Sequence, residues 1–300
     1  MVSSTLQTVA TKDSLGHVTR PGRALIGWLS EMDACLVLAE RRMDLALLPE
    51  NIERSARARQ AVQDRKPFEG QSEVVIAPES SLDGYIAAFT AQPDYKPFAS
   101  EGWQVKIADL SKVCALQPIV FWDHSQERTE GAQLGDMHSV AAITLPTRTS
   151  PDSLPIQFDG ARNTWIVTSR NPNLRVISPF NSPIATDDGQ TFIGCGFLLA
   201  ISPSYVQVAH YRGRYLLRDG YHRALGLLAR GITHAPVLFR DFGSYAALGL
   251  PAGMLPEQSY LGDRPPLIAD YLSEDVSAEI RAPASQKMIV VQGMEMNPLG

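Results

Sequence analysis

Apolar side chains recur at helical spacing near the start of the chain. In residues 23–48 they fall at i, i+3 and i+4 intervals, which predicts a helix that Pro49 ends or restarts. Residues 50–65 interleave arginines with acidic residues, a pattern typical of a helix with a solvated face. We therefore expect a helical N-terminal region at 23–100, preceded by a flexible N-terminal arm or a loosely attached strand at 1–22.

Alternation of apolar and polar positions replaces this spacing in the middle of the chain. Residues 103–107 alternate like a half-buried strand, and residues 117–121 form a second extended piece. The polar stretch 122–138 predicts a loop or insertion. Short β-rich runs between turn residues over 139–200 predict a small sheet with hairpins.

The most regular pattern lies further on. A strand at 205–210 and a return strand at 214–218 flank a tight turn at Gly213. A helix is expected from about Tyr221 to Arg230, where Gly231 is a natural terminator, and an apolar strand follows at 235–239.

These elements predict an α+β fold, in which a mixed sheet with packed helices follows the helical N-terminal segment. The α+β domain is expected over residues 101–272 and contains the insertion. Residues 273–300 are expected to form a C-terminal tail with one strand candidate at 288–291.

The Asp-Gly-Tyr-His-Arg turn at 219–223 is the candidate functional site. Asp219 stands where a helix cap is expected, and Gly220 leaves room for a ligand at the backbone. His222 and Arg223 follow in the first helical turn, where the helix dipole disfavours cations. A phosphate held by helix N–H groups and Arg223 would offset that cost. In the structural alternative, Asp219 only caps the helix and His222 is a satisfied, half-buried histidine.

The same segment resembles the core of the ParB/sulfiredoxin superfamily. The resemblance rests on the run YLLRDGYHRAL at 215–225, on Gly231 after the helix and on APV at 235–237. It covers about 205–240, and 103–121 resembles the opening strands of the same fold. The resemblance implies a ParB/sulfiredoxin-like mixed sheet.

The resemblance also implies roles for individual residues, because the turn binds nucleotide phosphates in that family. Gly220, Tyr221, His222 and Arg223 are the expected phosphate ligands, and Asp219 and His222 the expected catalytic residues. The implied ligand is ATP or CTP with magnesium.

Two departures from the family narrow these expectations. Sulfiredoxin has its catalytic cysteine where this chain has Tyr221, so reduction of a sulfinic acid is not expected. No helix-turn-helix pattern follows the segment, so centromere binding is not expected either. The remaining function is nucleotide-phosphate binding, with phosphoryl transfer or nucleotide hydrolysis as its chemistry. A non-catalytic protein-interaction module that retains the fold, with a protein partner or as a homodimer, and a DNA-binding accessory protein are the alternatives.

Composition excludes further classes of function. The 300 residues carry a net charge of −5, which argues against a protein that coats nucleic acid. Three widely spaced cysteines argue against a disulfide framework or a structural zinc site. His124 and His138 share a polar stretch with several acids, but no known ligand spacing links them, so no metal site is assigned. A secretory signal and a membrane span are not evident, so a cytoplasmic protein is expected.

Overall fold

The computed structural model describes residues 11–12, 18–68, 73–147, 156–169, 174–185, 191–201, 204–283 and 287–292. Over these ranges the protein is an α+β structure with several sheets and packed helices. The chain divides into two compact units. Unit 1 consists of Met1–Thr147 and Ser204–Ala284, and unit 2 consists of Arg148–Pro203 and Ser285–Gly300.

The larger sheet of unit 1 contains the strands on both sides of the 219–223 turn. Its strand order is β11 (Arg214–Asp219), β10 (Gln207–Tyr211), β12 (His234–Asp241), β4 (Gln104–Asp109) and β3 (Val75–Ile76). β10 is antiparallel to β11 and parallel to β12. Helix α8 (Tyr221–Ala229) connects β11 to β12. The predicted order of strand, turn, strand, helix and strand is therefore confirmed.

A second sheet of unit 1 pairs segments from the two ends of the chain. β2 (Val18–Ala24) is antiparallel to β13 (Ala278–Pro283), and it also pairs with β1 (Thr11–Lys12) and β5 (Ile119–Phe121). Residues 18–22 therefore belong to a strand and not to a flexible arm. Its partner β13 comes from the predicted tail, so no local pattern could indicate the pairing.

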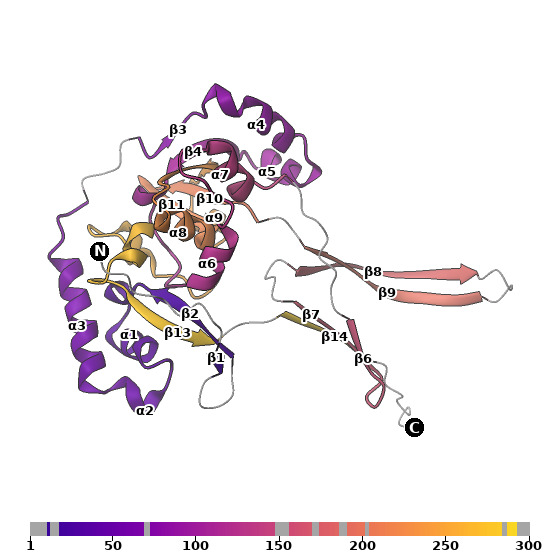
Figure 1. Cartoon of the computed structure of the whole chain (residues 1–300), viewed down its shortest axis with the longest axis horizontal. Coiled ribbons are helices and arrows are strands. Elements are labelled where there is room, and N and C mark those ends of the chain that lie inside the picture. The colour runs from indigo at the N-terminus through magenta and orange to yellow at the C-terminus, as the bar shows by residue number, and fades with distance from the viewer. Residues whose placement is uncertain are drawn as a thin grey trace. The chain divides into compact units, whose positions relative to one another are not determined.

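Helices pack on both sheets of unit 1. The α-helices not yet named are α1 (Glu31–Leu38), α2 (Met43–Ala46), α3 (Pro49–Gln63), α4 (Asp83–Thr90), α5 (Lys96–Ser100), α6 (Trp122–Arg128), α7 (Met137–Thr144), α9 (Tyr245–Leu248) and α10 (Glu257–Leu261). The 3-10 helices are η1 (Ile26–Trp28), η2 (Ser80–Leu82), η3 (Pro93–Tyr95), η4 (Leu110–Lys112) and η5 (Ile268–Leu272). Figure 1 shows α1 and α3 beside β2 and β13, with which they share a small apolar core.

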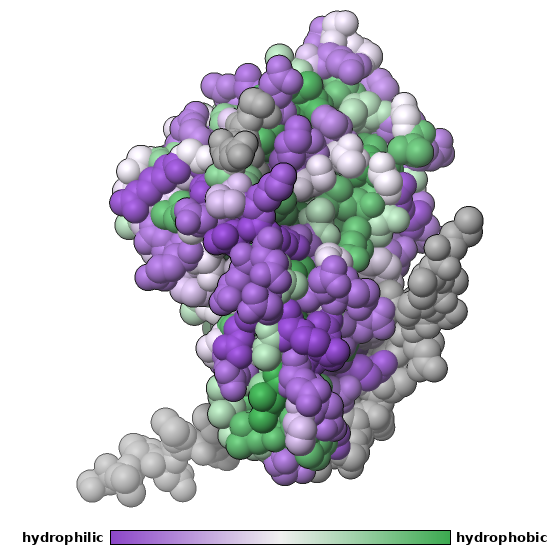
Figure 2. Space-filling model, turned by 90° about the vertical axis from the view of Figure 1, so that its left-hand side faces the viewer, coloured by the Kyte–Doolittle hydropathy of each residue, from purple (hydrophilic) through white to green (hydrophobic). Residues whose placement is uncertain are grey.

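The predicted solvated face of residues 50–65 is confirmed by α3. The helix buries Ser55, Ala58 and Val62, which lie on one side, and leaves most of its charged side chains exposed. Figure 2 views the molecule from the side on which α3 lies, and hydrophilic residues cover most of that face.

The main core of unit 1 surrounds β11, α8 and β12. Leu216 and Leu217 of β11 and Leu225 of α8 are fully buried in it. Gly226 faces α6, because a Cβ atom at this position would lie 2.5 Å from Oγ1 of Thr129. The absence of a side chain at Gly226 therefore lets α6 lie directly against α8.

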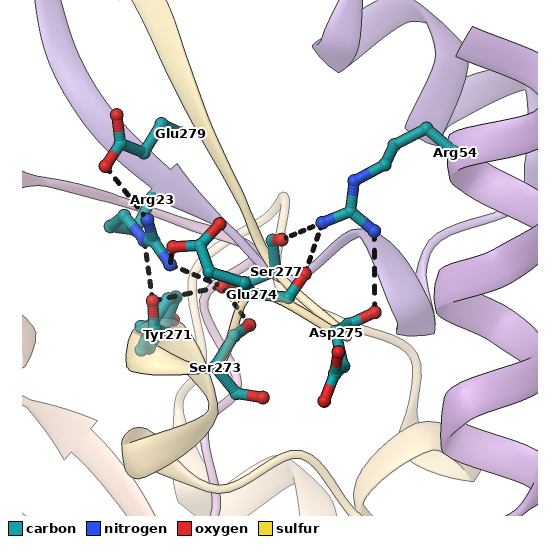
Figure 3. Close-up of polar contacts among 8 residues, drawn as sticks. All are labelled: Arg23, Arg54, Tyr271, Ser273, Glu274, Asp275, Ser277 and Glu279. Carbon is teal, nitrogen blue, oxygen red and sulfur yellow. Dashed lines mark hydrogen bonds and ion pairs between the residues drawn. The ribbon is translucent and has the colours of Figure 1, made fainter. Parts of the chain in front are cut away.

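A buried arginine fixes β2 to the C-terminal part of unit 1 (Figure 3). Arg23 is only 4% exposed, and it donates to the Tyr271 carbonyl at 2.7 Å and to Ser277 Oγ at 3.0 Å. It also forms ion pairs with Glu274 at 2.7 Å and Glu279 at 3.3 Å. These partners satisfy a charge that would be costly to bury alone.

Arg54 of α3 binds the same C-terminal segment from the other side (Figure 3). It donates to the backbone carbonyls of Glu274, Asp275 and Ser277. The two arginines together hold this segment between β2 and α3.

Unit 2 consists of β-structure over its described residues. One sheet has the order β14 (Lys287–Gln292), β7 (Thr164–Ser169) and β6 (Ile156–Asp159), and β8 (Leu174–Ala185) pairs with β9 (Thr191–Ile201) in a separate ribbon. The predicted hairpins and the strand candidate at 288–291 are confirmed.

Three sequence predictions about local structure are wrong. The polar stretch 122–138 is not a loop, because it contains α6 and the start of α7, whose cap is Asp136. Residues 140–145 belong to the β-rich runs expected over 139–200, but they lie mostly in α7. The helix predicted from residue 23 begins only at Glu31, since β2 continues to Ala24.

Candidate functional site

The 219–223 turn joins β11 to α8 through a left-handed residue. Gly220 has a φ of 93° and stands at the N-cap position of α8, where no side chain caps the helix. Asp219 is still part of β11, and its Oδ1 accepts a hydrogen bond from the Gly220 N–H at 2.6 Å. The prediction that Asp219 caps the helix is therefore wrong, because the strand continues one residue beyond the expected point.

Gly220 is required by its packing as well as by its φ. A Cβ atom there would lie 2.8 Å from Cγ2 of Val206. The space beside Gly220 is thus filled by the protein itself, whereas the sequence interpretation reserved it for a ligand.

Tyr221 lies in the core. Its hydroxyl donates to the Leu217 carbonyl and accepts from the Leu116 N–H at 2.9 Å. Burial raises the pKa of this hydroxyl well above its usual range. Tyr221 therefore ties α8 to β11 and to the segment before β5, and the structure does not bring its hydroxyl to a phosphate site.

His222 lies between α8 and the start of α6. Its Nε2 accepts the Phe121 N–H at 3.4 Å, and its ring is parallel to that of Phe121 at a centroid distance of 6.2 Å. Burial, with Arg128 and Arg20 nearby, lowers the pKa of His222 to about 3. The imidazole is therefore neutral at pH 7, and its expected cationic role is wrong because burial outweighs any benefit of the charge.

A second histidine meets His222 from α6. The rings of His124 and His222 are in edge contact at 5.4 Å. Arg20 of β2 donates to His124 Nε2 and, through Nε, to Asp123 Oδ2 at 2.6 Å. This pairing assigns the His124 proton to Nδ1, which faces Glu127 at 3.5 Å. Burial and Arg20 lower the pKa of His124, so it too is neutral.

Two further guanidinium groups lie beside Asp219. Arg223 donates to the Ser204 carbonyl, and burial with Arg128 nearby lowers the pKa of Arg223 to about 10. Burial also lowers the pKa of Arg128, which makes no hydrogen bond or ion pair with any residue in the described ranges. Burial raises the pKa of the Asp219 carboxyl, although Arg223 nearby acts in the opposite direction.

We call these groups the arginine cluster, since all of them except Asp123 interact electrostatically with His222 or Asp219. Its members are Arg20, Arg128, Arg223, His124, His222, Asp123 and Asp219. Arg218 also acts on the Asp219 carboxyl, and Glu127 faces His124, so four guanidinium groups meet three carboxylates and two neutral imidazoles, which leaves one positive charge in excess. Chemically, it can accept an anion.

The sequence interpretation found only part of this cluster. Asp219, His222 and Arg223 lie in it as expected, whereas Arg20, Asp123 and Arg128 were not recognised as site residues. If 122–128 is recognised as a helix, Asp123 and His124 lie in its first turn and Arg128 lies about one turn later, so all three are close together.

The weaker metal-site candidate is not assembled. His138 contacts the ring of Tyr85 at 6.4 Å, whereas His124 contacts His222. Within the described ranges, no group of three or more histidine, cysteine or acidic side chains is placed to hold a metal ion.

Among the helices that the structure describes, none combines the length and apolarity needed to cross a bilayer.

Comparison with known proteins gives no match of any kind. No protein-family model, no curated protein and no solved structure matches this chain.

Proposed function

We propose that unit 1 binds the phosphate groups of a nucleotide at the arginine cluster. The observation that carries this proposal is the half-buried Arg128, whose guanidinium has no hydrogen-bond partner among the described residues. Burying an unpaired cation is costly. A phosphate would offset that cost through charge-assisted hydrogen bonds.

The role of each residue follows from the N–H groups that it does not already use in hydrogen bonds within the protein. Arg128 and the second terminal nitrogen of Arg223 bind phosphate oxygens, while Arg20 is held by Asp123 and adds positive potential. His222 binds as a neutral donor through Nδ1, because its Nε2 accepts the Phe121 N–H. Gly220 and Tyr221 support the turn without touching the ligand.

Phosphoryl transfer or nucleotide hydrolysis is the chemistry that we propose for this site. Asp219 is the better candidate base, because burial raises the pKa of its carboxyl and so increases its affinity for a proton. With a pKa of about 3, His222 is a weak proton acceptor at neutral pH. A magnesium ion bound mainly by ATP or CTP phosphates needs only one or two protein carboxylates, and we assign Asp123 to it, since Asp219 acts as the base.

A fold of the ParB/sulfiredoxin type is part of the same proposal. It is supported by the hairpin of β10 and β11, by the left-handed Gly220 and by the return through α8 and Gly231 to β12. These elements match the order in which the resemblance places them.

Isothermal titration calorimetry with CTP, ATP and ADP, with and without magnesium, tests the proposal. We expect saturable binding by the wild type and at least tenfold weaker binding by Arg128→Ala, because one charge-assisted contact to phosphate is lost. Absence of binding by the wild type contradicts the proposal.

Arg212→Ala is the matched control. Arg212 is an exposed arginine of the β10–β11 turn that pairs with Glu257, away from the cluster. It should bind nucleotide like the wild type. Equal affinity of Arg128→Ala and Arg212→Ala would show that the anion binds elsewhere.

The second candidate function is a protein-interaction module. The observation that favours it is the number of large apolar side chains exposed in unit 2, among them Phe158, Trp165 and Ile193.

A further inference from the structure

The sheet of unit 2 has an apolar face built from two cross-strand rows. In one row Ile156 is opposite Val167, which is opposite Ile289. In the next row Phe158, Trp165 and Val291 follow each other in the same way. Because side chains two residues apart point to the same side of a strand, all six lie on one face. We call it the apolar face.

The apolar face has large exposed side chains on its middle strand β7 and its edge strand β6, although Val167 of β7 is buried. Trp165 is 50% exposed and Phe158 is 51% exposed, although their rings contact each other at a centroid distance of 4.5 Å. Ile156 is 62% exposed. A three-stranded sheet needs a buried apolar face to be stable in water. Soluble monomers rarely leave such a surface uncovered.

The ribbon of β8 and β9 adds a second apolar surface to unit 2. Ile193 is 75% exposed and Phe197 is 46% exposed on one side of it, where each lies opposite a proline of β8. On the other side the ring of Phe180 lies over Gly196 and is 43% exposed. An isolated two-stranded ribbon is only marginally stable in water.

We propose that unit 2 is a self-association element, in which the apolar face stacks against the same face of a second copy of this chain. Neither row of the face contains a charged side chain, so the two rows of one copy meet those of the other without unpaired charge, and Lys287 follows only at the next pair, opposite Ser169. A face without charges also offers little to select a foreign partner by charge complementarity. A two-fold axis would make each row contact its equivalent in the other copy.

The exposed area fits this occupant. Covering the exposed side chains of the face and the ribbon would bury on the order of 800 Å² per copy, which is what a stable interface takes from each partner. The apolar face alone supplies roughly half of that area, so the dimer interface must also include side chains of the β8–β9 ribbon.

Sedimentation equilibrium of the full chain between about 5 and 200 µM tests the proposal. We expect the wild type to sediment as a dimer of the 32.8 kDa chain. Trp165→Lys and Phe158→Ser should each raise the dimer dissociation constant at least tenfold, because each removes one of the two aromatic anchors of the face. Both side chains are half exposed in a single copy, so the changes should leave the circular dichroism spectrum unchanged.

Gln157→Lys is the matched control, because Gln157 lies on β6 between Ile156 and Phe158 but points to the opposite face. It should keep the dimer. A wild type that remains monomeric at 200 µM overturns the proposal, and so does a dimer whose affinity neither face variant weakens. A monomer that binds phosphatidylcholine vesicles through Trp165 also overturns it, because lipid would then be the occupant. None of these outcomes depends on nucleotide binding.

Discussion

Two helical glycines of unit 1 differ in what a methyl group would meet. At Gly226 of α8 it would lie 2.5 Å from Thr129 Oγ1, whereas at Gly84 of α4 nothing lies within 4 Å. We expect Gly226→Ala to lower the free energy of unfolding by about 1 to 3 kcal/mol, because α6 must move away. Urea denaturation measures this change.

Gly84→Ala is the control, since it makes the same chemical change in open space. It should raise the free energy of unfolding by up to about 1 kcal/mol through helix propensity. If Gly226→Ala were stabilising like Gly84→Ala, α6 and α8 could not be in the close contact described above.

The depressed pKa of His222 makes stability depend on pH. Its pKa is about 3 in the folded protein and 6.5 in an unperturbed histidine. Between these values the unfolded chain binds a proton that the folded chain does not. The free energy of unfolding therefore falls as the pH falls from 6.5, by at most about 1.4 kcal/mol per pH unit from this group. Above pH 6.5 the imidazole is neutral in both the folded and the unfolded state, so it no longer makes stability depend on pH.

His222→Gln should flatten this dependence between pH 6.5 and 4.5, as measured by urea denaturation at several pH values. Some dependence remains, because the pKa of His124 is lowered too. The exposed His138 gives the control, since His138→Gln should keep the wild-type dependence. A wild-type slope in His222→Gln would mean that the imidazole is protonated in the folded state.

At this scale the sequence could indicate only residues that are neighbours in the chain. Asp219, His222 and Arg223 follow each other, so their spacing predicts a common site. Arg20 reaches the same place from β2, nearly two hundred positions earlier. Local spacing also cannot indicate burial, which is why His222 was expected to be a cation.

At the scale of elements, the end of α1 departs from the usual choice of residue. Leu36 and Val37 accept the N–H groups of Arg41 and Glu40, which is the Schellman arrangement. Glu40 then occupies the left-handed position, with a φ of 53°, where glycine is preferred. We expect Glu40→Gly to raise the free energy of unfolding by about 1 kcal/mol, because a side chain in this conformation is strained.

Thermal and urea denaturation check this prediction. Glu40→Gln removes the charge but keeps the strain, so it should have the stability of the wild type. A destabilised Glu40→Gly would show that the side chain makes a favourable contact that outweighs the backbone strain.

Elements were predictable where their pattern reflects burial on one side. The alternation of β10 and β11 and the spacing in α8 follow this rule, and all three were recognised. Helix α6 does not follow this rule, because its buried residue is the polar Ser125, whose carbonyl faces Gly226. A helix that packs through its backbone against a glycine has no apolar stripe to recognise.

At the scale of the whole molecule, pairing between distant segments determines the architecture. The α+β class could be predicted, because it follows from the types of element present. The sheet of β2, β5 and β13 could not, since its strands come from the start, the middle and the end of the chain. The same holds for unit 2, to which β14 contributes from beyond residue 284.

The pairing of β2 with β13 also sets the order of events during synthesis. β2 leaves the ribosome early, but β13 and every described hydrogen-bond partner of the buried Arg23 side chain lie beyond residue 270. At 5 to 20 residues per second, the roughly 250 intervening residues take about 13 to 50 seconds to make. For that time the nascent chain displays an open strand edge, which is a site for aggregation. Unit 1 can close its second sheet only when translation is almost complete, so a chaperone that covers this edge of β2 would act before β13 exists.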